Sequence, residues 1–222
     1  MIFKDRTDAG RKLAALLTRY ADRGDVLVLA LPRGGVPVAF EVARELKAPL
    51  DVFLVRKLGV PGHEELAMGA LAADGVRFIN VELVDYLGIP NEVIDEIAGV
   101  EQQELDRQAE IYRANRPPPD VKDRVVILID DGLATGSTMR AAAASLRLKK
   151  PRRIVVAVPV SSPETCDEFR KVVDEIVCAF TPENLQGVGL WYDDFSQTSD
   201  EVVRELLKRA TQNERQVTAR GL

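Results

Sequence analysis

Two adjacent carboxylates precede a short segment that is rich in hydroxyl groups. Asp130 and Asp131 follow an apolar run, and Thr135, Ser137 and Thr138 come shortly after them. Neighbouring carboxylates repel each other and gain nothing from a nearby anion, so their presence favours a ligand that brings hydroxyl groups or a metal ion. A ribose, with its vicinal hydroxyl groups, is such a ligand.

The hydroxyl-rich segment has the composition of a phosphate site. Residues 135–138 stand where an alanine-rich helix is expected to begin, and Gly136 permits a close approach of the backbone. The free amides and the macrodipole of a helix N-terminus favour an anion there. Each piece alone has a structural explanation, since acids often end strands and Thr-Gly-Ser often caps a helix. Their combination in this order favours a binding site.

Two further segments place glycines or cations after apolar runs. Pro32-Arg33-Gly34-Gly35 follows the first run, and Arg56-Lys57 follows the second. A glycine pair lets backbone amides approach a ligand, and cations neutralise charge that develops on a leaving group. A plain turn and a pair of solvated cations are the alternative explanations.

Candidates for proton transfer lie just beyond Lys57. Two glycines and a proline interrupt residues 56–63, which predicts a long and mobile loop. Glu64 on such a loop is a candidate to exchange a proton with an incoming substrate, and His63 and Glu65 are open to the same role. The alternative is that these are ordinary surface residues.

Aromatic side chains gather near the C-terminal part of the chain. Trp191, Tyr192 and Phe195 lie within five residues, close to glycines. Such rings can stack on a planar substrate, so Trp191 and Tyr192 are candidates for acceptor binding. Packing of the tail against the core is the alternative.

Alternating strands and helices are expected to position these segments. Short apolar runs predict buried strands at residues 26–31, 51–55, 125–129, 154–160 and 173–179. Helices are expected at residues 36–46, 139–148 and 163–171. The alternation predicts an α/β fold with a doubly wound, mainly parallel sheet covered on both faces. Ligands bind beyond the carboxyl ends of such strands, where the candidate loops lie.

The remaining elements are expected at the two ends and in the middle of the chain. Thr7 or Asp8 is expected to cap a first helix with Leu13, Leu16, Leu17 and Tyr20 on one face. Residues 76–79 form a weak strand, and residues 81–115 predict two helices. A last helix is expected to start at a Thr198/Glu201 capping box and to point Val202, Val203, Leu206 and Leu207 inward.

Composition excludes several classes of protein. The 222 residues, 46% of them apolar, suffice for one domain, and the net charge of -5 argues against nucleic-acid binding. Cys166, Cys178 and His63 cannot build a disulfide framework or a zinc site. The charged N-terminus and the absence of a long apolar run predict no signal peptide and no membrane span, which favours the cytoplasm.

One segment resembles the signature of type I phosphoribosyltransferases that binds phosphoribosyl pyrophosphate (PRPP). It is Val125-Val126-Ile127-Leu128-Ile129-Asp130-Asp131-Gly132-Leu133-Ala134-Thr135-Gly136-Ser137-Thr138. The resemblance implies that Asp130 and Asp131 hold the ribose hydroxyls directly or through Mg²⁺, and that residues 134–138 cradle the 5-phosphate. The segment Pro32-Arg33-Gly34-Gly35 resembles the pyrophosphate loop of that family, which often contains a strained non-proline peptide. Arg56 and Lys57 would neutralise the pyrophosphate.

The resemblance also implies an activity. A member of this family transfers ribose 5-phosphate from PRPP to a nucleobase or other nitrogen acceptor, as in purine or pyrimidine salvage, and releases pyrophosphate. Asp130, Asp131, Lys57 and Glu64 would be its catalytic residues. Ala134 stands where oxopurine-specific members carry an acid, so hypoxanthine and guanine are disfavoured and the acceptor stays open. A PRPP-sensing regulatory protein without catalysis is the alternative.

The domain organisation follows from the same resemblance. One phosphoribosyltransferase-like domain is expected over residues 1–222, with a core at about 24–180 and a helical insert at about 81–116. A small hood that closes over the acceptor, with the last helix, is expected at about 181–212. The insert is a candidate surface for a homodimer.

Overall fold

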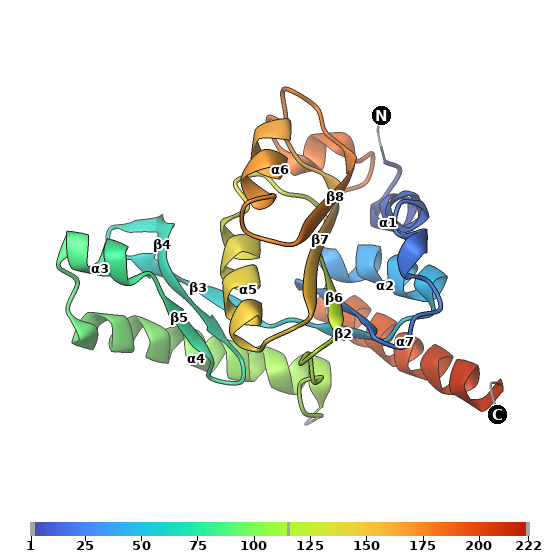
Figure 1. Ribbon diagram of the computed structural model, residues 1–222, viewed down its shortest axis with the longest axis horizontal. Coiled ribbons are helices and arrows are strands. Elements are labelled where there is room, and N and C mark those ends of the chain that lie inside the picture. The colour runs from blue at the N-terminus through green and yellow to red at the C-terminus, as the bar shows by residue number, and fades with distance from the viewer. Residues whose placement is uncertain (1–2, 115, 221–222) are drawn as a thin grey trace.

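A five-stranded parallel sheet forms the centre of the molecule (Figure 1). The computed structural model describes residues 3–114 and 116–220, without the side chains of residues 64, 65 and 214–220. In spatial order the strands are β2 (Leu50–Val52), β1 (Val26–Ala30), β6 (Val125–Ile129), β7 (Arg153–Val160) and β8 (Glu175–Phe180). The expected sheet is therefore confirmed, although its second strand is shorter than predicted and lies at an edge.

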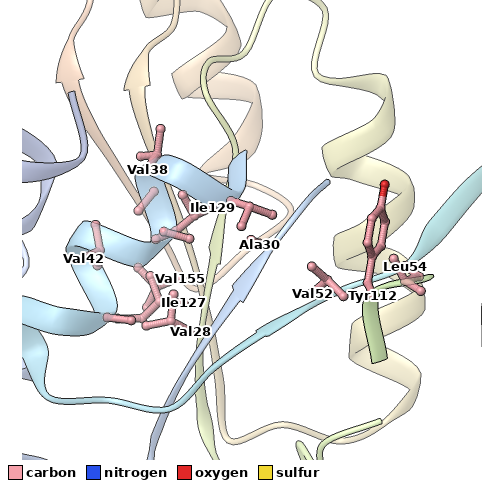
Figure 2. Packing of buried hydrophobic residues seen from close by; sticks show 14 of the residues in the cluster. Val28, Ala30, Val38, Val42, Val52, Leu54, Tyr112, Ile127, Ile129 and Val155 are labelled. Carbon is pink, nitrogen blue, oxygen red and sulfur yellow. The ribbon is translucent and has the colours of Figure 1, made fainter. Parts of the chain in front are cut away.

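Helices cover both faces of this sheet. One face is packed by α1 (Arg6–Ala15), α2 (Gly35–Leu46) and α7 (Asp200–Arg220), and the other by α5 (Ser137–Leu148) and α6 (Pro163–Phe169). Val28 and Ile127 point to the first face, where they meet Val38 and Val42 of α2 (Figure 2). Each such fully buried side chain contributes about 1.5–3 kcal/mol. The doubly wound arrangement is confirmed.

The strand order places a switch point between β1 and β6. The chain moves outward from β1 to β2 and then returns to form β6 on the other side of β1. Ala30 pairs with Ile129 in the register of these two strands, so their carboxyl ends are level. Connections diverge from a switch point and leave a crevice there, which is where ligands of open α/β sheets bind.

A second, antiparallel sheet lies on the far side of α5 from the central sheet (Figure 1). It consists of β3 (Val55–Val60), β4 (His63–Ala72) and β5 (Arg77–Ile79). Val55, Ala70 and Ala72 share a buried cluster with side chains of α5. The insert helices α3 (Val81–Leu87) and α4 (Asn91–Arg113) follow, as predicted, and α4 packs along β3 and α7.

The long loop predicted at residues 56–63 is wrong. The structure forms a β-hairpin there, with Pro61 and Gly62 in the turn and Gly62 at a φ of 76°. A glycine with positive φ suits a tight hairpin turn, so the signals taken for a loop belong to the turn and its irregular pairing. Arg56 and Lys57 consequently lie on β3.

Two predictions at the helix ends also need correction. Asp5, rather than Thr7 or Asp8, caps α1 by accepting a hydrogen bond from the Asp8 amide. At the start of α7 the Ser199 hydroxyl accepts from the Val202 amide, so the Thr198/Glu201 capping box is not formed.

Leu16 and Val202 are 49% and 45% exposed, respectively, instead of pointing inward. Leu13, Leu17 and Val203 are buried as expected, and two short 3₁₀ helices are η1 (Thr18–Tyr20) and η2 (Val188–Trp191). Among the described residues, no helix combines the length and the hydropathy needed to cross a bilayer.

Candidate active site

The loops that follow β1 and β6 touch each other. The Leu31 amide donates to the Ile129 carbonyl at 2.8 Å, which continues the pairing of the two strands. A Cβ atom on Gly34 would lie 2.0 Å from Oδ2 of Asp131, and one on Gly35 would lie 2.7 Å from the Ile129 carbonyl oxygen. Both glycines are therefore required by close packing. The peptide bond between Pro32 and Arg33 is cis.

The paired acids lie at the carboxyl end of β6, beside the glycine loop. Oδ1 of Asp130 accepts the Asp131 amide at 2.8 Å, and Oδ2 of Asp131 accepts Nε of Arg6 at 2.8 Å. Burial raises the pKa of both carboxyls, and the charge of Asp131 raises the pKa of Asp130 further. The positive charge of Arg6 opposes this effect and lowers the pKa of both carboxyls. Two adjacent, partly buried carboxyl groups suit a ligand that brings hydroxyl donors or positive charge.

The donor set also decides what kind of metal site is feasible. Among the side chains that the structure describes, no three His, Cys, Asp or Glu residues converge into a protein-only cage. Mg²⁺ is usually held by one or two carboxylates, with water and substrate phosphates completing its shell. Asp130 and Asp131 fit an ion of that kind, arriving together with a phosphorylated ligand.

The hydroxyl-rich loop turns into α5 through a left-handed glycine. Gly136 has a φ of 70°, and a Cβ there would lie 2.5 Å from the Phe169 ring. The Thr165 hydroxyl, from the start of α6, donates to the Ala134 carbonyl at 3.2 Å and supports the loop from beneath. Thr135 and Thr138 are exposed. The loop therefore presents its hydroxyls and the first amides of α5 outward, as an anion site requires.

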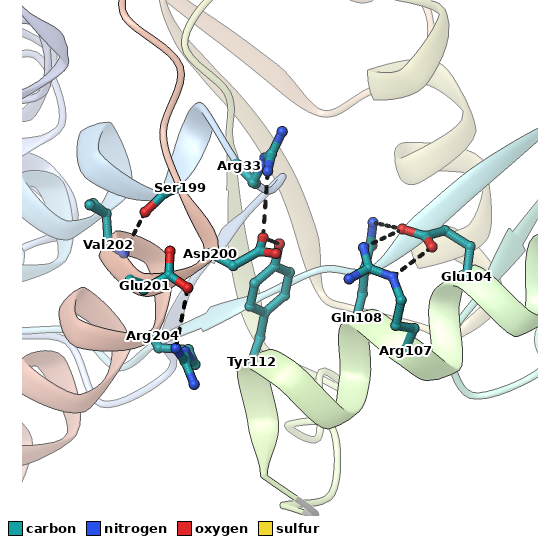
Figure 3. Close-up of polar contacts among 10 residues, drawn as sticks. All are labelled: Arg33, Glu104, Arg107, Gln108, Tyr112, Ser199, Asp200, Glu201, Val202 and Arg204. Carbon is teal, nitrogen blue, oxygen red and sulfur yellow. Dashed lines mark hydrogen bonds and ion pairs between the residues drawn. The ribbon is translucent and has the colours of Figure 1, made fainter.

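Two of the expected pyrophosphate cations are held by carboxylates. Nη1 of Arg33 lies 3.7 Å from Oδ1 of Asp200, which also accepts the Tyr112 hydroxyl (Figure 3). Nε of Arg56 lies 2.5 Å from Oε2 of Glu101. Tyr112 and Glu101 both belong to α4, so the helical insert fixes the surroundings of both arginines.

A hollow of about 590 Å³ lies between the hairpin and the start of α5. Arg56, Lys57 and the Pro61–Gly62 turn line one side, α4 lines another, and Thr138 reaches it from α5. The two predicted cations of β3 therefore face the same space as the start of α5, although they come from a different sheet. This volume lies within the range of pockets that hold small molecules.

The aromatic tail packs beside Asp131. The Tyr192 hydroxyl donates to the Asp131 carbonyl at 2.6 Å, and its ring lies 5.3 Å from Phe3 and 5.0 Å from Phe195. Trp191 packs against the Phe180 ring. Tyr192 is only 6% exposed, and in this structure it holds the backbone at Asp131 in place. Acceptor binding by Trp191 and Tyr192 stays a prediction.

The structure brings most of the predicted site residues to one end of the central sheet. His63 lies exposed beside the hairpin turn, and the side chains of Glu64 and Glu65 fall outside the described part, so their proton-transfer role stays a prediction. Arg6 and Asp200 were missed. Each contacts the site across more than a hundred residues of sequence, and no local pattern in the chain signals such a contact.

Comparisons with known proteins identify relatives of this chain. The family model described as a phosphoribosyl transferase domain matches residues 2–193. A protein of Mycobacterium tuberculosis H37Rv, provisionally named a phosphoribosyl transferase, is 44% identical over 94% of this chain and 47% of its own length. The chain thus spans about half the length of that curated relative.

Two further matches cover different shares of the chain. The bifunctional protein PyrR of Clostridium acetobutylicum is 31% identical over 58% of this chain and 68% of its own length. The crystal structure of TT1426 from Thermus thermophilus is 41% identical, covers 94% of this chain and 99% of its own, and superimposes with a TM-score of 0.87.

Proposed function

Because this chain belongs to the phosphoribosyl transferase family, we propose that it transfers ribose 5-phosphate from PRPP to a nitrogen acceptor and releases pyrophosphate. The observation that carries the proposal is the contact between the glycine loop and the acid pair, where Gly34 leaves no room for a Cβ beside Asp131. In PRPP the pyrophosphate is attached to the anomeric carbon, next to the ribose hydroxyls. Two loops in contact suit those two neighbouring groups.

Each loop has a distinct role in this proposal. Asp130 and Asp131 accept hydrogen bonds from the ribose hydroxyls, and the amides and hydroxyls of residues 135–138 bind the 5-phosphate. The backbone at Gly34 and Gly35 approaches the pyrophosphate without side-chain obstruction. Arg33 supplies positive charge from the same loop.

The reaction breaks the bond between the anomeric carbon and the pyrophosphate oxygen, and the electron pair leaves with pyrophosphate. The acceptor nitrogen forms the new bond and then loses a proton. Negative charge grows on the departing oxygens, where Arg33, Arg56 and Lys57 stabilise it. Magnesium bound with PRPP at Asp130 and Asp131 would supply further positive charge. Holding both reactants in one orientation provides much of the remaining acceleration.

The acceptor in this proposal is a nucleobase or a small amine. Ala134 is exposed, and its carbonyl is already engaged by the Thr165 hydroxyl. This position therefore offers a methyl group and no carboxylate to an acceptor, which disfavours oxopurines. Glu64 remains the proposed proton acceptor.

The proposal is tested by titrating the protein with PRPP and magnesium in a calorimeter, and by then measuring pyrophosphate release with a panel of nucleobases and amines. Binding is expected in the wild-type protein and is expected to weaken at least about 100-fold when Asp130→Asn and Asp131→Asn are combined, since each charged hydrogen bond contributes roughly 1.5–3 kcal/mol. The matched control combines Asp167→Asn with Glu168→Gln, an adjacent acid pair exposed on α6.

The outcomes separate the candidate activities. Binding followed by pyrophosphate release supports the transferase and identifies its acceptor. Binding without release from any acceptor supports a PRPP-sensing protein instead. Equal binding by the wild-type protein and the Asp130→Asn/Asp131→Asn variant contradicts the assignment of the acid pair.

The homodimer expected from the helical insert stays a prediction. On α3 and α4, Val81, Tyr86 and Val100 are 61%, 85% and 64% exposed, respectively. Apolar side chains this exposed are suited to a contact between subunits. Sedimentation analysis of the wild-type protein and of a Tyr86→Glu variant checks it: the wild type is expected to sediment as a dimer and the variant as a monomer.

A further inference from the structure

Arg6 lies where three segments that are distant in sequence meet. Its Nε donates to Oδ2 of Asp131 at 2.8 Å, and its Nη1 donates to the Ser196 carbonyl at 2.7 Å. The guanidinium group also lies 4.0 Å from the centre of the Phe195 ring. The Arg6 side chain is only 11% exposed, so one cation links the acid pair to the aromatic tail inside the protein.

The local fold directs Arg6 to this place. Phe3 forms a parallel bridge with Tyr192, in which the Phe3 amide donates to Trp191 and the Asp193 amide donates to Phe3. Asp5 then caps α1, and Arg6 is the first residue of that helix. The backbone on both sides of Arg6 is therefore fixed, which places its side chain beside Asp131.

Asp131 is confined from several sides. Oδ2 of Asp131 contacts Gly34 so closely that no Cβ fits, and the position of a Gly34 Cβ would lie 3.3 Å from Nε of Arg6. The Tyr192 hydroxyl holds the Asp131 carbonyl at 2.6 Å. Among the described side chains, Arg6 is the one cation that forms an ion pair with Asp131. Arg6 therefore determines where this carboxylate points.

An arginine suits this position better than a lysine does. Its planar guanidinium donates in two directions and stacks on an aromatic ring at once, whereas an ammonium group is a compact point charge. In this structure one direction serves Asp131, the other serves Ser196, and the plane lies over Phe195. Loss of any one contact would loosen the other two.

We propose that Arg6 is a positioning residue for PRPP: it orients Asp131 toward the ribose and couples occupation of the acid pair to the placement of the aromatic tail. The inference rests on the proposed function. When the ribose hydroxyls donate to Asp131, they compete with its hydrogen bond from Arg6. The resulting shift is passed to residues 191–196 through the contact of Arg6 with Ser196 and the contact of Asp131 with Tyr192. The tail that lies on the proposed acceptor side thereby responds to PRPP.

Trp191 provides the readout, because it is the single tryptophan of the chain and lies in this tail. Magnesium and PRPP are titrated into the wild-type protein and into Arg6→Met, Arg6→Lys and Arg11→Met variants, with heat and Trp191 fluorescence followed in parallel. Arg11→Met is the matched control, since Arg11 also lies on α1 and pairs with a buried carboxylate, Glu41, at 3.1 Å.

The wild-type protein and Arg11→Met are expected to bind PRPP with the same affinity and to change Trp191 emission on binding. Arg6→Met is expected to bind roughly 10- to 100-fold more weakly, the loss typical of one charged hydrogen bond, and to show no emission change. Arg6→Lys is expected to recover part of the affinity without the emission change. A merely structural arginine would lower stability and leave both PRPP responses intact.

Each contrary outcome has a definite meaning. Wild-type affinity and emission change in Arg6→Met would overturn the inference and leave the proposed function standing. Failure of the wild-type protein to bind PRPP would overturn both. Should Arg6→Met fail to fold, Arg6→Lys and Phe195→Leu decide the question, because Phe195→Leu loosens Arg6 from the tail without removing its charge. If PRPP changes Trp191 emission in both of those variants as much as it does in the wild-type protein, the coupling is refuted.

Discussion

Gly136, immediately before α5, allows the sharpest quantitative test of the hydroxyl-rich loop. Gly136 combines a φ of 70° with close packing, since a Cβ would lie 2.5 Å from Cε2 of Phe169. An Ala at this position is expected to cost roughly 1 kcal/mol for the left-handed backbone. Overpacking against the buried Phe169 ring adds about 1–3 kcal/mol. Gly136→Ala should therefore lower the free energy of unfolding by about 2–4 kcal/mol.

A second glycine separates the two contributions. Gly88 ends α3 with a φ of 62°, but a Cβ there meets no atom within 4 Å, so Gly88→Ala carries the backbone cost alone. Urea denaturation of Gly136→Ala, of Phe169→Leu and of their combination forms a double-mutant cycle, and Gly88→Ala measured in the same way gives the backbone cost. Phe169→Leu should restore part of the loss in the Gly136→Ala background. Equal losses in Gly136→Ala and Gly88→Ala would refute the packing of Phe169 beneath the loop.

Three further predictions concern the groups around the acid pair and the two thiols. Burial raises the pKa of Asp130 above its ordinary value of 3.8. Ionisation of Asp130 therefore lowers the stability of the folded protein increasingly as the pH rises above that value. Asp130→Asn should make the protein more stable than wild type at neutral pH, and the difference should vanish in acid. Urea denaturation at several pH values checks this, and a destabilised variant at neutral pH would contradict it. Tyr192→Phe leaves the Asp131 carbonyl without its donor and should cost about 1–3 kcal/mol in the same assay. The hydrogen bond with Cys178, at a Sγ–Sγ distance of 2.7 Å, lowers the pKa of Cys166 to about 7; thiolate absorbance should show this titration, and Cys178→Ala should move it upward.

The central sheet and the main loop could be predicted because their signals are local. Val125–Ile129 is apolar at every position, since β6 lies inside the sheet with helices on both faces. The acids and the hydroxyl-rich segment follow it without interruption, so one stretch of sequence contains the strand, the loop and the helix start. Parallel strands then bring Gly34 and Gly35 to the same edge of the sheet.

The remaining features depend on contacts that no short stretch of sequence encodes. Arg56 and Lys57 looked like loop cations because glycines and a proline follow them, yet cross-strand pairing with β4 makes a hairpin of the segment. Arg6 reaches Asp131 only because the Phe3–Tyr192 bridge draws the N-terminus onto the tail. Each of these contacts depends on pairing between separate segments of the chain, so only the tertiary structure shows them.

The most direct test of the account is a competition experiment on PRPP binding. If the glycine loop and the acid pair form one site, the wild-type protein should bind one PRPP per chain in the presence of magnesium. Ribose 5-phosphate and pyrophosphate should each displace it, because each occupies one part of that site. PRPP that binds but is displaced by neither compound, or no binding of PRPP at all, would contradict the assignment of the two loops.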